Sequence, residues 1–390
     1  MLVRKVLFLI GSIDSGGVSK SLVNTLNAFD RTHYDVHLMV MSGHLGEFSV
    51  YLPKDITIHM SECAILALKG WCGTFGYFKR LQFKRGFLSI VRMFISQFDK
   101  SNAGWLLSRL FPVLSDSFDM IVDYNGQQQL YYMVDKLRAR KKVTFFHSDY
   151  SKWSYYEKMD RQYFPKVDAI FTISDQCVDS LRRFFPEVSD KIRLFENITS
   201  PQVIEKLAQE PIECTGLHGC ILLTVGHVWY NKGIDLAIEA ASIVKQHGVD
   251  FTWLFVGKIA EPKWGDEVKS RGLSEYIHFL GVKSNPYPYL QKADIVVHPS
   301  RFEGKSITLD EAKLLCKPIV VTNFSTVHDQ FHDRENATIC EMCGDSIAKG
   351  ITELIDDERL REKYVKTLMR QKEDNSSEVI KLYKILEADV

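Results

Sequence analysis

Two glutamates eight residues apart, Glu303 and Glu311, are the side chains best placed for chemistry on a bound ligand. The apolar run 295–297 is too short for a helix and ends in a loop at His298, so it predicts a buried parallel strand. Apolar residues after this loop recur at helical spacing, and Cys316 is the last of them. This pattern places Glu311 inside a helix. Because open α/β sheets bind ligands at the carboxyl ends of their strands, we expect both carboxylates to face one crevice.

The spacing of the two glutamates limits what they can do together. Eight residues on a continuous helix span about 12 Å, whereas a glycosidase holds one bond between carboxylates roughly 5 to 9 Å apart. The pair therefore suits a clamp on a long ligand better than a glycosidase pair. The alternative is a solvated loop glutamate and a helix-surface glutamate without function. The β-branched run 319–322 begins another strand and completes a strand, helix, strand unit.

Residues 300–322, SRFEGKSITLDEAKLLCKPIVVT, resemble the E-x7-E signature of the family 4 retaining glycosyltransferases, the group 1 type. In that family the first glutamate faces the donor sugar and the second holds the ribose hydroxyls. The resemblance implies a catalytic Glu303 and a donor-binding Glu311. The backbone amides that meet sugar and phosphate would be those of Gly304, Lys305, Ser306 and Ile307. An apolar residue commonly stands where this chain has Lys305, and this departure bears on the donor preference.

A glycine-rich loop follows the first apolar run, 6–10, and precedes a predicted helix. It has neither the lysine spacing of a P-loop nor the G-x-G-x-x-G dinucleotide fingerprint. The pair Gly16 and Gly17 is therefore predicted to let the backbone approach a ligand at a helix N-terminus, with a bare turn as the alternative. The pair resembles the Gly-Gly loop near the donor diphosphate of the same transferases.

Lys232 follows the buried run 220–225 and stands at the start of a predicted helix. A cation at a helix N-terminus makes a phosphate site, because exposed amides and the helix dipole already favour an anion. Similar transferases usually have Gly-Arg where this chain has Gly226 and His227, and a neutral imidazole is a poorer phosphate partner than guanidinium. The resemblance implies donor binding at Gly226 and His227 and stabilisation of the leaving diphosphate by Lys232. Either Lys232 and Lys305 compensate for the missing arginine, or turnover is weakened.

His147 stands at the carboxyl end of the predicted strand 143–146. The alternative is that this lone histidine has a structural role. A strand end that faces the crevice, however, is where a functional residue would lie. Similar enzymes have a histidine here near the donor sugar, which implies a catalytic His147. Val282, after the predicted strand 277–280, resembles the loop beside the nucleotide base and is expected to bind the donor.

The composition is that of a soluble globular protein, with 390 residues, 45% of them hydrophobic and 25% charged. The formal net charge is zero, so no global field recruits nucleic acid. No apolar run approaches the ~18 to 20 residues of a membrane span, and the short N-terminal apolar core does not fit a signal peptide. Eight scattered cysteines do not form a disulfide framework, and 340–343 is a single C-x-x-C.

Residues 69–100 carry seven lysines and arginines against one acid, Asp99, and interleave them with eight aromatic residues. Basic residues mixed with aromatics suit the surface of a membrane that contains anionic lipid. Nucleic acid is one alternative. The other is a set of ordinary helices that pack an aromatic face and leave their charges in solvent.

The alternation of strands and helices predicts an α/β protein with two doubly wound Rossmann-like domains that face a cleft, and the resemblance names this architecture GT-B. We expect an N-terminal acceptor-side domain over residues 1–197 and a nucleotide-sugar-binding domain over 198–370. Residues 371–390 are expected to form a terminal helix that returns to the N-terminal domain.

The resemblance implies a retaining transfer of sugar from a nucleotide-sugar, with a UDP-sugar favoured, to an acceptor hydroxyl. The expected acceptor is a saccharide or lipid-linked saccharide of polysaccharide biosynthesis, which places the protein in the cytoplasm and peripherally on the inner face of the membrane through 69–100. No metal and no cofactor is expected, because the sequence has no Asp-x-Asp. Two other classes stay open: a nucleotide-sugar epimerase on the same fold, and a non-catalytic nucleotide-sugar-binding subunit, which would explain His227.

Overall fold

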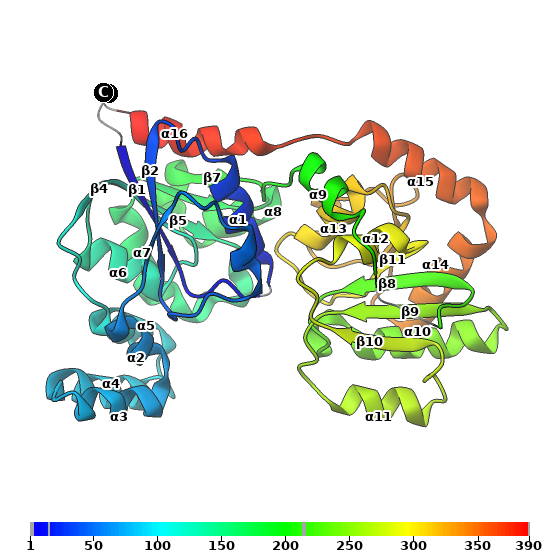
Figure 1. The fold of residues 1–390 in the computed structure, drawn as a ribbon, viewed down its shortest axis with the longest axis horizontal. Coiled ribbons are helices and arrows are strands. Elements are labelled where there is room, and N and C mark those ends of the chain that lie inside the picture. Colours follow the sequence, from blue (N-terminus) through cyan, green and yellow to red (C-terminus); the bar gives the residue numbers. More distant parts are fainter. Residues whose placement is uncertain (1–3, 15, 213–215, 389–390) are drawn as a thin grey trace. The chain divides into compact units, whose positions relative to one another are not determined.

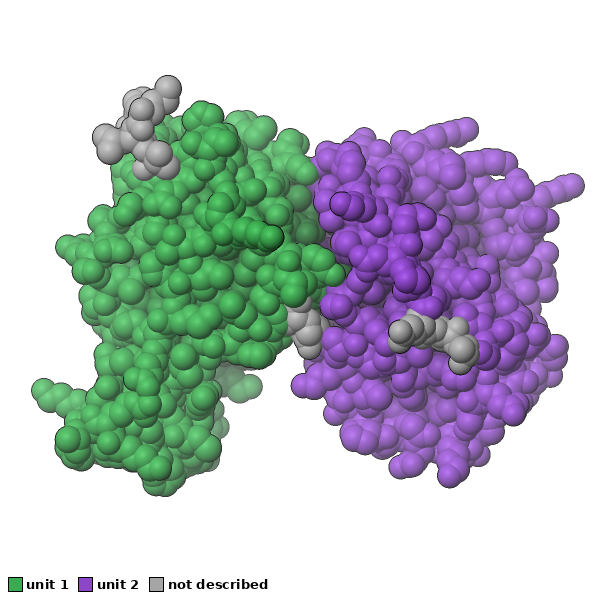
Figure 2. Space-filling model, viewed as in Figure 1, with its two compact units in different colours: residues 1–198, 376–390 green, residues 199–375 purple. Residues whose placement is uncertain are grey.

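The computed structural model of the protein describes residues 4–14, 16–212 and 216–388. The chain divides into two compact units, coloured separately in Figure 2. Unit 1 comprises residues 1–198 and 376–390, and unit 2 comprises residues 199–375. Each unit is built around its own parallel sheet (Figure 1).

Unit 1 contains a seven-stranded sheet in the order β3-β2-β1-β4-β5-β6-β7, in which neighbouring strands pair in parallel. The strands are β1 (Arg4–Ile10), β2 (Tyr34–Val40), β3 (Thr57–His59), β4 (Ser117–Asp123), β5 (Arg138–Phe146), β6 (Ala169–Thr172) and β7 (Ile192–Leu194). Alternate residues of β1 point to opposite faces, so Leu7 joins one hydrophobic core and Phe8 the other.

Helices cover both faces of this sheet. One core receives residues from α1 (Gly17–Ala28) and α16 (Ile380–Glu387). The other receives residues from α2 (Glu62–Leu68), α3 (Gly70–Lys79), α5 (Lys100–Leu110), α6 (Gln128–Lys136), α7 (Glu157–Tyr163) and α8 (Asp175–Phe184). Between α3 and α5 lies α4 (Phe83–Ile95). The short 3-10 segments of the unit are η1 (Glu47–Tyr51), η2 (Tyr150–Lys152), η3 (Ser154–Tyr156), η4 (Phe164–Lys166), η5 (Pro186–Lys191) and η8 (Ser376–Val379).

Unit 2 repeats this plan with a six-stranded sheet in the order β10-β9-β8-β11-β12-β13. Its strands are β8 (Cys220–Val225), β9 (Phe251–Val256), β10 (Ile277–Gly281), β11 (Ile295–His298), β12 (Ile319–Thr322) and β13 (Thr338–Cys340). One face is covered by α10 (Ile234–Gln246), α11 (Lys263–Ser270), α14 (Gly344–Asp356) and α15 (Glu358–Arg370). The other is covered by α9 (Pro201–Leu207), α12 (Tyr287–Lys292) and α13 (Ile307–Leu314), and η6 (Tyr230–Lys232) and η7 (Val327–Asp329) are short 3-10 segments.

The predicted fold class is confirmed, because both units are doubly wound parallel sheets with helices on both faces. The strand order reverses between β1 and β4 in unit 1 and between β8 and β11 in unit 2. Ligands of open α/β sheets bind beyond the carboxyl ends of the strands at such reversals. The loops after these four strands are therefore the places to look for a site. No helix in the described ranges has the length and apolar composition of a membrane span.

The C-terminal helix α16 belongs to unit 1 although the whole of unit 2 precedes it in the sequence. Leu382 is fully buried in the core that contains β1 and α1. The ring of Tyr383 stacks on Tyr34 of β2 with 4.9 Å between centroids, and the Lys381 ammonium donates to the Leu194 carbonyl at 3.0 Å. Apolar burial and these polar contacts together attach α16 to its sheet.

We expect Leu382→Ala to destabilise unit 1 by roughly 2 to 5 kcal/mol, because the substitution leaves a cavity in a closed core. Pulse proteolysis in urea, with the fragments of the two units resolved on a gel, measures this loss. Lys384→Ala, an exposed change two residues further along the same helix, is the control. Equal unfolding midpoints for unit 1 in the two variants would show that α16 does not stabilise it.

Candidate active site

The loops that follow β8 and β11, residues 226–233 and 299–306, lie at the strand-order reversal of unit 2. β8 and β11 pair directly, with Leu222 beside Ile295. Both strands are nearly pure apolar runs that are buried on both faces, so the polar residues begin where each strand ends. This edge of the sheet therefore brings Lys232 from one loop to Glu303 from the other.

One oxygen of the Glu303 carboxylate is the centre of a polar cluster. Glu303 Oε1 accepts from Lys232 Nζ at 2.5 Å, from His298 Nε2 at 2.8 Å and from Ser300 Oγ at 2.8 Å. The side chain of Glu303 is only 13% exposed, and that of Lys232 is 28% exposed. Within the part of the chain that the structure describes, no hydrogen bond reaches Oε2, which leaves this oxygen for a ligand.

The protonation states in this cluster follow from burial and charge. Burial alone would raise the pKa of Glu303, but the Lys232 ammonium and the hydrogen bonds of the cluster hold that pKa well below its usual range. Burial lowers the pKa of His298, and its contact with Glu303 offsets this only in part. The cluster is therefore a carboxylate beside an ammonium, with a neutral imidazole that donates its Nε2 proton.

The two loops are fastened to each other by backbone and by charge. Gly233 has φ +68°, and a Cβ there would lie 1.9 Å from the Pro299 carbonyl oxygen, so only glycine fits between the loops. The Arg301 amide donates to the Asn231 carbonyl at 3.0 Å. The Arg301 guanidinium pairs with both oxygens of Asp235 at 2.7 Å. This forked contact fixes the β11 loop on the first turn of α10.

Glycines also bring bare backbone to the ends of the neighbouring strands. Gly226 has φ +154° and Gly257 has φ +153°, and a Cβ on Gly257 would lie 2.0 Å from the Gly226 carbonyl oxygen. The stem of Lys232 runs close to Gly226, since a Cβ added there would lie 3.8 Å from Cδ and Cε of the lysine. His227 follows Gly226 and is partly buried. The side chain of Lys232 thus lies along the main chain at 226–227.

The segment between the two glutamates is held by Gln330. Gln330 Oε1 accepts from the Ser306 amide at 3.0 Å, and its Nε2 donates to the Ser306 carbonyl at 3.0 Å and to Asp310 at 2.9 Å. Thr326 Oγ1 donates to the Glu303 carbonyl at 3.1 Å. The Ser306 amide is therefore engaged inside the protein in this structure. The donor-binding roles of Gly304, Lys305, Ser306 and Ile307 stay predictions.

Glu311 lies in α13 and is fully buried. Its Oε1 accepts from the Tyr287 hydroxyl of α12 at 2.8 Å. This contact crosses from one helix to the next and fixes the direction of the carboxylate. Its contact with a ribose stays a prediction, and so does donor binding at Val282, which follows the end of β10.

In unit 1, His147 follows β5 at the carboxyl edge of the sheet. Its ring lies against Tyr124 and Phe145, with centroids 4.8 and 5.6 Å away. Burial lowers the pKa of His147 to about 4, which a hydrogen bond to the Tyr124 backbone only partly offsets. Its buried Nε2 has no hydrogen-bond partner in the described residues. A neutral imidazole whose acceptor nitrogen has no partner can accept a hydrogen bond from a hydroxyl group.

The glycine loop of unit 1 ends at Gly16 and Gly17, where α1 begins. Gly16 is extended, with φ 173°, so its backbone does not require glycine. A Cβ added to it would meet no atom within 4 Å. The absence of a side chain at Gly16 therefore leaves open space beside the N-terminus of α1, as backbone contact with a ligand would require. Ser15 lies outside the described residues.

The structure brings Lys232 and Glu303 into contact, which the sequence analysis did not predict, and adds partners that it missed. These are His298, Ser300, Arg301 with Asp235, and Gln330. His298 and Ser300 had a signal in the sequence, because polar residues directly after a buried strand stand at the ligand-binding edge. Gln330 had none, since its contact with Ser306 joins residues 24 apart.

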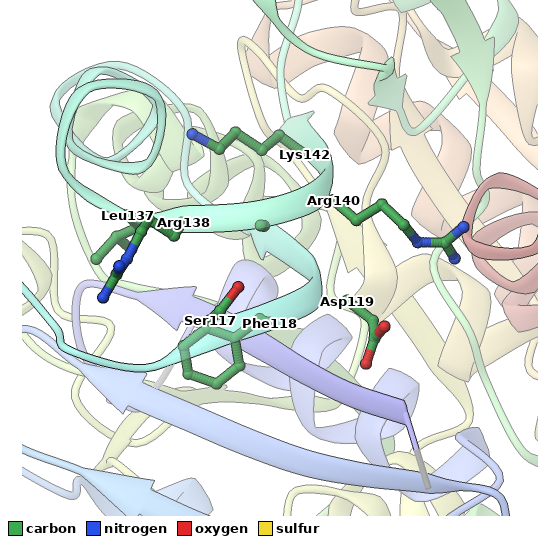
Figure 3. Close-up of a pocket in the computed structure, with 8 residues that line it drawn as sticks. Ser117, Phe118, Asp119, Leu137, Arg138, Arg140 and Lys142 are labelled. Carbon is green, nitrogen blue, oxygen red and sulfur yellow. The ribbon is translucent and has the colours of Figure 1, made fainter. Parts of the chain in front are cut away.

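Figure 3 shows a pocket of about 600 Å³ elsewhere in unit 1. Its lining comes from the first residues of β4 and β5, so it lies at the amino edge of the sheet, opposite the strand ends described above. Arg138 and Arg140 donate to the carbonyls of Ser115 and Leu386, and Lys142 donates to the Val134 carbonyl at 3.0 Å. These cations are engaged in hydrogen bonds with backbone carbonyl groups, so the pocket gives no sign of a ligand site.

Part of this chain resembles known proteins in sequence. The family described as glycosyl transferases group 1 matches residues 218–369. An alpha-D-kanosaminyltransferase of Streptomyces kanamyceticus is 25% identical over 222 residues, 55% of this chain and 56% of that protein. The capsular polysaccharide biosynthesis glycosyltransferase CapM of Staphylococcus aureus is 30% identical over 142 residues, 35% of this chain and 37% of that protein. The match thus spans about half the length of the first relative and about a third of the second.

A crystal structure of Anabaena HepE in complex with UDP and glucose has the same fold throughout. It superimposes with a TM-score of 0.71 at 15% identity, and the alignment covers 99% of this chain and 100% of that one. A likeness at this identity concerns the fold, and the fold is GT-B. Residues 218–369 thus match the group 1 glycosyl transferases, and the chain has the GT-B fold.

Proposed function

We propose that the protein transfers a sugar, with retention at the anomeric carbon, from a nucleotide-sugar to an acceptor hydroxyl. The observation that carries the proposal is the contact of Glu303 Oε1 with Lys232, His298 and Ser300 at the strand-order reversal of a group 1 domain. The cluster combines a fixed carboxylate with a cation at the start of a helix. No metal and no cofactor forms part of this proposal.

The reaction breaks the bond between the anomeric carbon and a diphosphate oxygen and forms one from that carbon to the acceptor oxygen. The diphosphate leaves with the electron pair of the broken bond, and the proton of the acceptor hydroxyl passes to the departing diphosphate oxygen or to water. Lys232 and the N-terminus of α10, which begins at Ile234, are the groups that would stabilise this charge. Lys232 and the amide groups are fixed before the reaction begins, which is the arrangement that stabilises a transition state best.

Glu303 is assigned to the sugar side of the same site. Three donors hold Oε1 and fix the plane of the carboxylate, so Oε2 has a defined direction. A carboxylate that stays ionised can accept hydrogen bonds from sugar hydroxyls and stabilise positive charge that develops on the ring. His147, neutral and with a bare Nε2, is assigned to a second sugar hydroxyl.

The donor is proposed to be a UDP-sugar, which is supported by the UDP and glucose in the HepE complex. The acceptor is proposed to be a saccharide or lipid-linked saccharide of polysaccharide biosynthesis, which is supported by the name of CapM. A lipid-linked acceptor lies in a membrane, so the proposal includes peripheral association with the inner face of that membrane. Incubation with a series of UDP-sugars and detection of released UDP tests the donor class. An epimerase would convert the sugar without release of UDP.

Glu303→Gln should reduce transfer or donor hydrolysis by at least about a hundredfold while UDP still binds. The amide keeps the shape of the side chain but loses the charge that stabilises the sugar and pairs with Lys232. Turnover of a UDP-sugar and UDP binding by calorimetry are the two measurements. Near-normal turnover would remove Glu303 from the site.

Lys232→Ala should give the pH profile of turnover an acid limb at higher pH than in the parent enzyme. Without the ammonium, the burial of Glu303 is no longer opposed and its pKa rises, so activity falls as pH drops through this raised value. The parent profile should show no loss from Glu303 above about pH 5. His227→Ala, in the same loop, is the control, and a similar shift of the limb in that variant would contradict the assignment.

Glu311→Ala should weaken UDP binding by roughly 1 to 3 kcal/mol, the loss expected for charge-assisted hydrogen bonds to ribose hydroxyls. Tyr287→Phe removes only the hydroxyl that orients Glu311, so it should weaken binding less. Calorimetric titration of both variants with UDP makes the comparison. If UDP binds Glu311→Ala as tightly as the parent, Glu311 does not contact the nucleotide.

A further inference from the structure

Helices α3 and α4 form a hairpin, residues 70–95, in the crossover between β3 and β4 (Figure 1). The face of α4 that packs on α3 is made of small residues. Gly86 lies against the Phe78 ring, where a Cβ would come within 2.7 Å of it. Ser89 is buried and shares a hydrogen bond of 2.7 Å with Thr74 of α3. At these two positions α4 thus contributes close backbone approach and a hydroxyl group, and the Phe78 ring of α3 packs against the bare backbone of Gly86.

The outer face of α4 carries the large apolar residues. Phe83, Phe87 and Phe94 are 59%, 67% and 66% exposed, and Ile90 between them is 36% exposed. Their spacing of four, three and four residues puts all of them on one side of the helix. Phe98, just beyond the helix, is 77% exposed. A surface helix of a globular protein buries such a stripe, so the polarity of α4 is reversed.

Helix α3 and the turn of the hairpin expose further apolar side chains. Trp71 and Phe75 lie one turn of α3 apart and are 57% and 65% exposed. Leu81, in the turn, is 75% exposed. Soluble monomers rarely leave so many large apolar groups in solvent within one segment, and exposure of this kind marks an interaction surface.

The charges of the hairpin region divide into two groups. The exposed cations are Lys69, Lys79, Arg80, Lys84 and Lys100, of which Arg80 is paired to Glu62 and Lys100 lies over the Tyr155 ring. Arg85 turns inward and donates to Cys63 Sγ at 2.7 Å, and burial lowers the pKa of the half-buried Arg92. The count of seven cations in the sequence therefore overstates those available to a partner. The one acid of 69–100, Asp99, caps α5 by accepting from the Asn102 amide at 2.9 Å.

We propose that the α3–α4 hairpin docks the protein on a membrane that contains anionic lipid. The aromatic stripe of α4 would lie at the level of the lipid headgroups, and the exposed lysines beside it would contact lipid phosphates. Charge selects this partner over a second copy of the chain. Residues 70–95 contain no acid, and the neighbouring Glu62 is paired with Arg80. Two copies of this surface would therefore repel each other through Lys79 and Lys84, whereas an anionic bilayer complements it.

The place of the hairpin in unit 1 connects this surface with the proposed reaction. Its crossover leaves β3 at the carboxyl edge of the sheet, where His147 and the glycine loop also lie. Helix α2 contacts the loop after β2 at this edge, since a Cβ on Gly43 would lie 2.1 Å from Ile65 Cδ1. If the proposed function holds, docking through the hairpin would hold this edge near a lipid-linked acceptor.

Flotation of the full-length protein with lipid vesicles tests the proposal. The vesicles are phosphatidylcholine alone or phosphatidylcholine with phosphatidylglycerol in equal parts, at low and high salt. We expect binding to the anionic vesicles that weakens as salt rises. Phe83→Ser, Phe87→Ser and Phe94→Ser combined should lower the partition coefficient by more than about tenfold. Lys79→Ser with Lys84→Ser should abolish the preference for anionic lipid.

Matched controls separate these effects from a general loss of apolar or basic surface. Met369→Ser with Val203→Ser removes exposed apolar groups from unit 2, and Lys269→Ser with Lys349→Ser removes exposed cations there. Neither pair should alter vesicle binding. Circular dichroism verifies that every variant is folded. Binding does not use sugar transfer, so its failure would leave the proposed reaction untouched.

Three results would overturn the proposal. One is a parent protein that binds neither kind of vesicle. Another is a triple phenylalanine variant that binds as well as the parent. The third is light scattering that shows a dimer of the parent and a monomer of the triple variant, with no vesicle binding, because the stripe would then be an interface between copies of the chain.

Discussion

The contact between the Lys232 ammonium and the Glu303 carboxylate is the interaction on which the geometry of unit 2 depends. A carboxylate that is 13% exposed needs a partner, because the cost of burying a lone charge is large. The partner comes from a different loop, so the ion pair requires the loops after β8 and β11 to lie against each other. Gly233, without a side chain, permits this approach, and the forked contact of Arg301 with Asp235 maintains it. The contacts that hold these two loops together therefore form the candidate site and also stabilise the fold of unit 2.

The same ion pair also sets the protonation states of the neighbouring side chains. Because the ammonium keeps Glu303 ionised, the neighbouring His298 can stay neutral and serve as a proton donor in a hydrogen bond. A negative group and a positive group are then side by side, which suits the proposed donor, since it combines a neutral sugar with an anionic diphosphate. Holding both groups in place before the ligand arrives avoids reorganisation during the reaction.

Much of this architecture could be predicted from the sequence because the governing signals are local. Buried runs such as 220–225 and 295–297 predicted strands, and the position of Glu303 after the second run placed it at the ligand-binding edge. Contacts between distant residues could not be predicted in this way. Gln330 reaches Ser306 from 24 residues away, and the three-residue strand β13 is too short to show a period. The inward direction of Arg85 depends on its contact with Cys63, which composition alone cannot show.

The reversed polarity of α4 has a consequence for the stability of the hairpin. Its inner face offers Gly86 and Ser89, so packing on α3 buries little apolar area there, and glycine itself lowers helix stability by about 1 kcal/mol relative to alanine. The hydrogen bond between Ser89 and Thr74 adds on the order of 1 kcal/mol. The aromatic rings that would normally stabilise such a helix face solvent instead. A surface that covers these rings would therefore stabilise the hairpin itself as well as hold the protein in place, and the gain is largest when the cover is as apolar as a lipid interface.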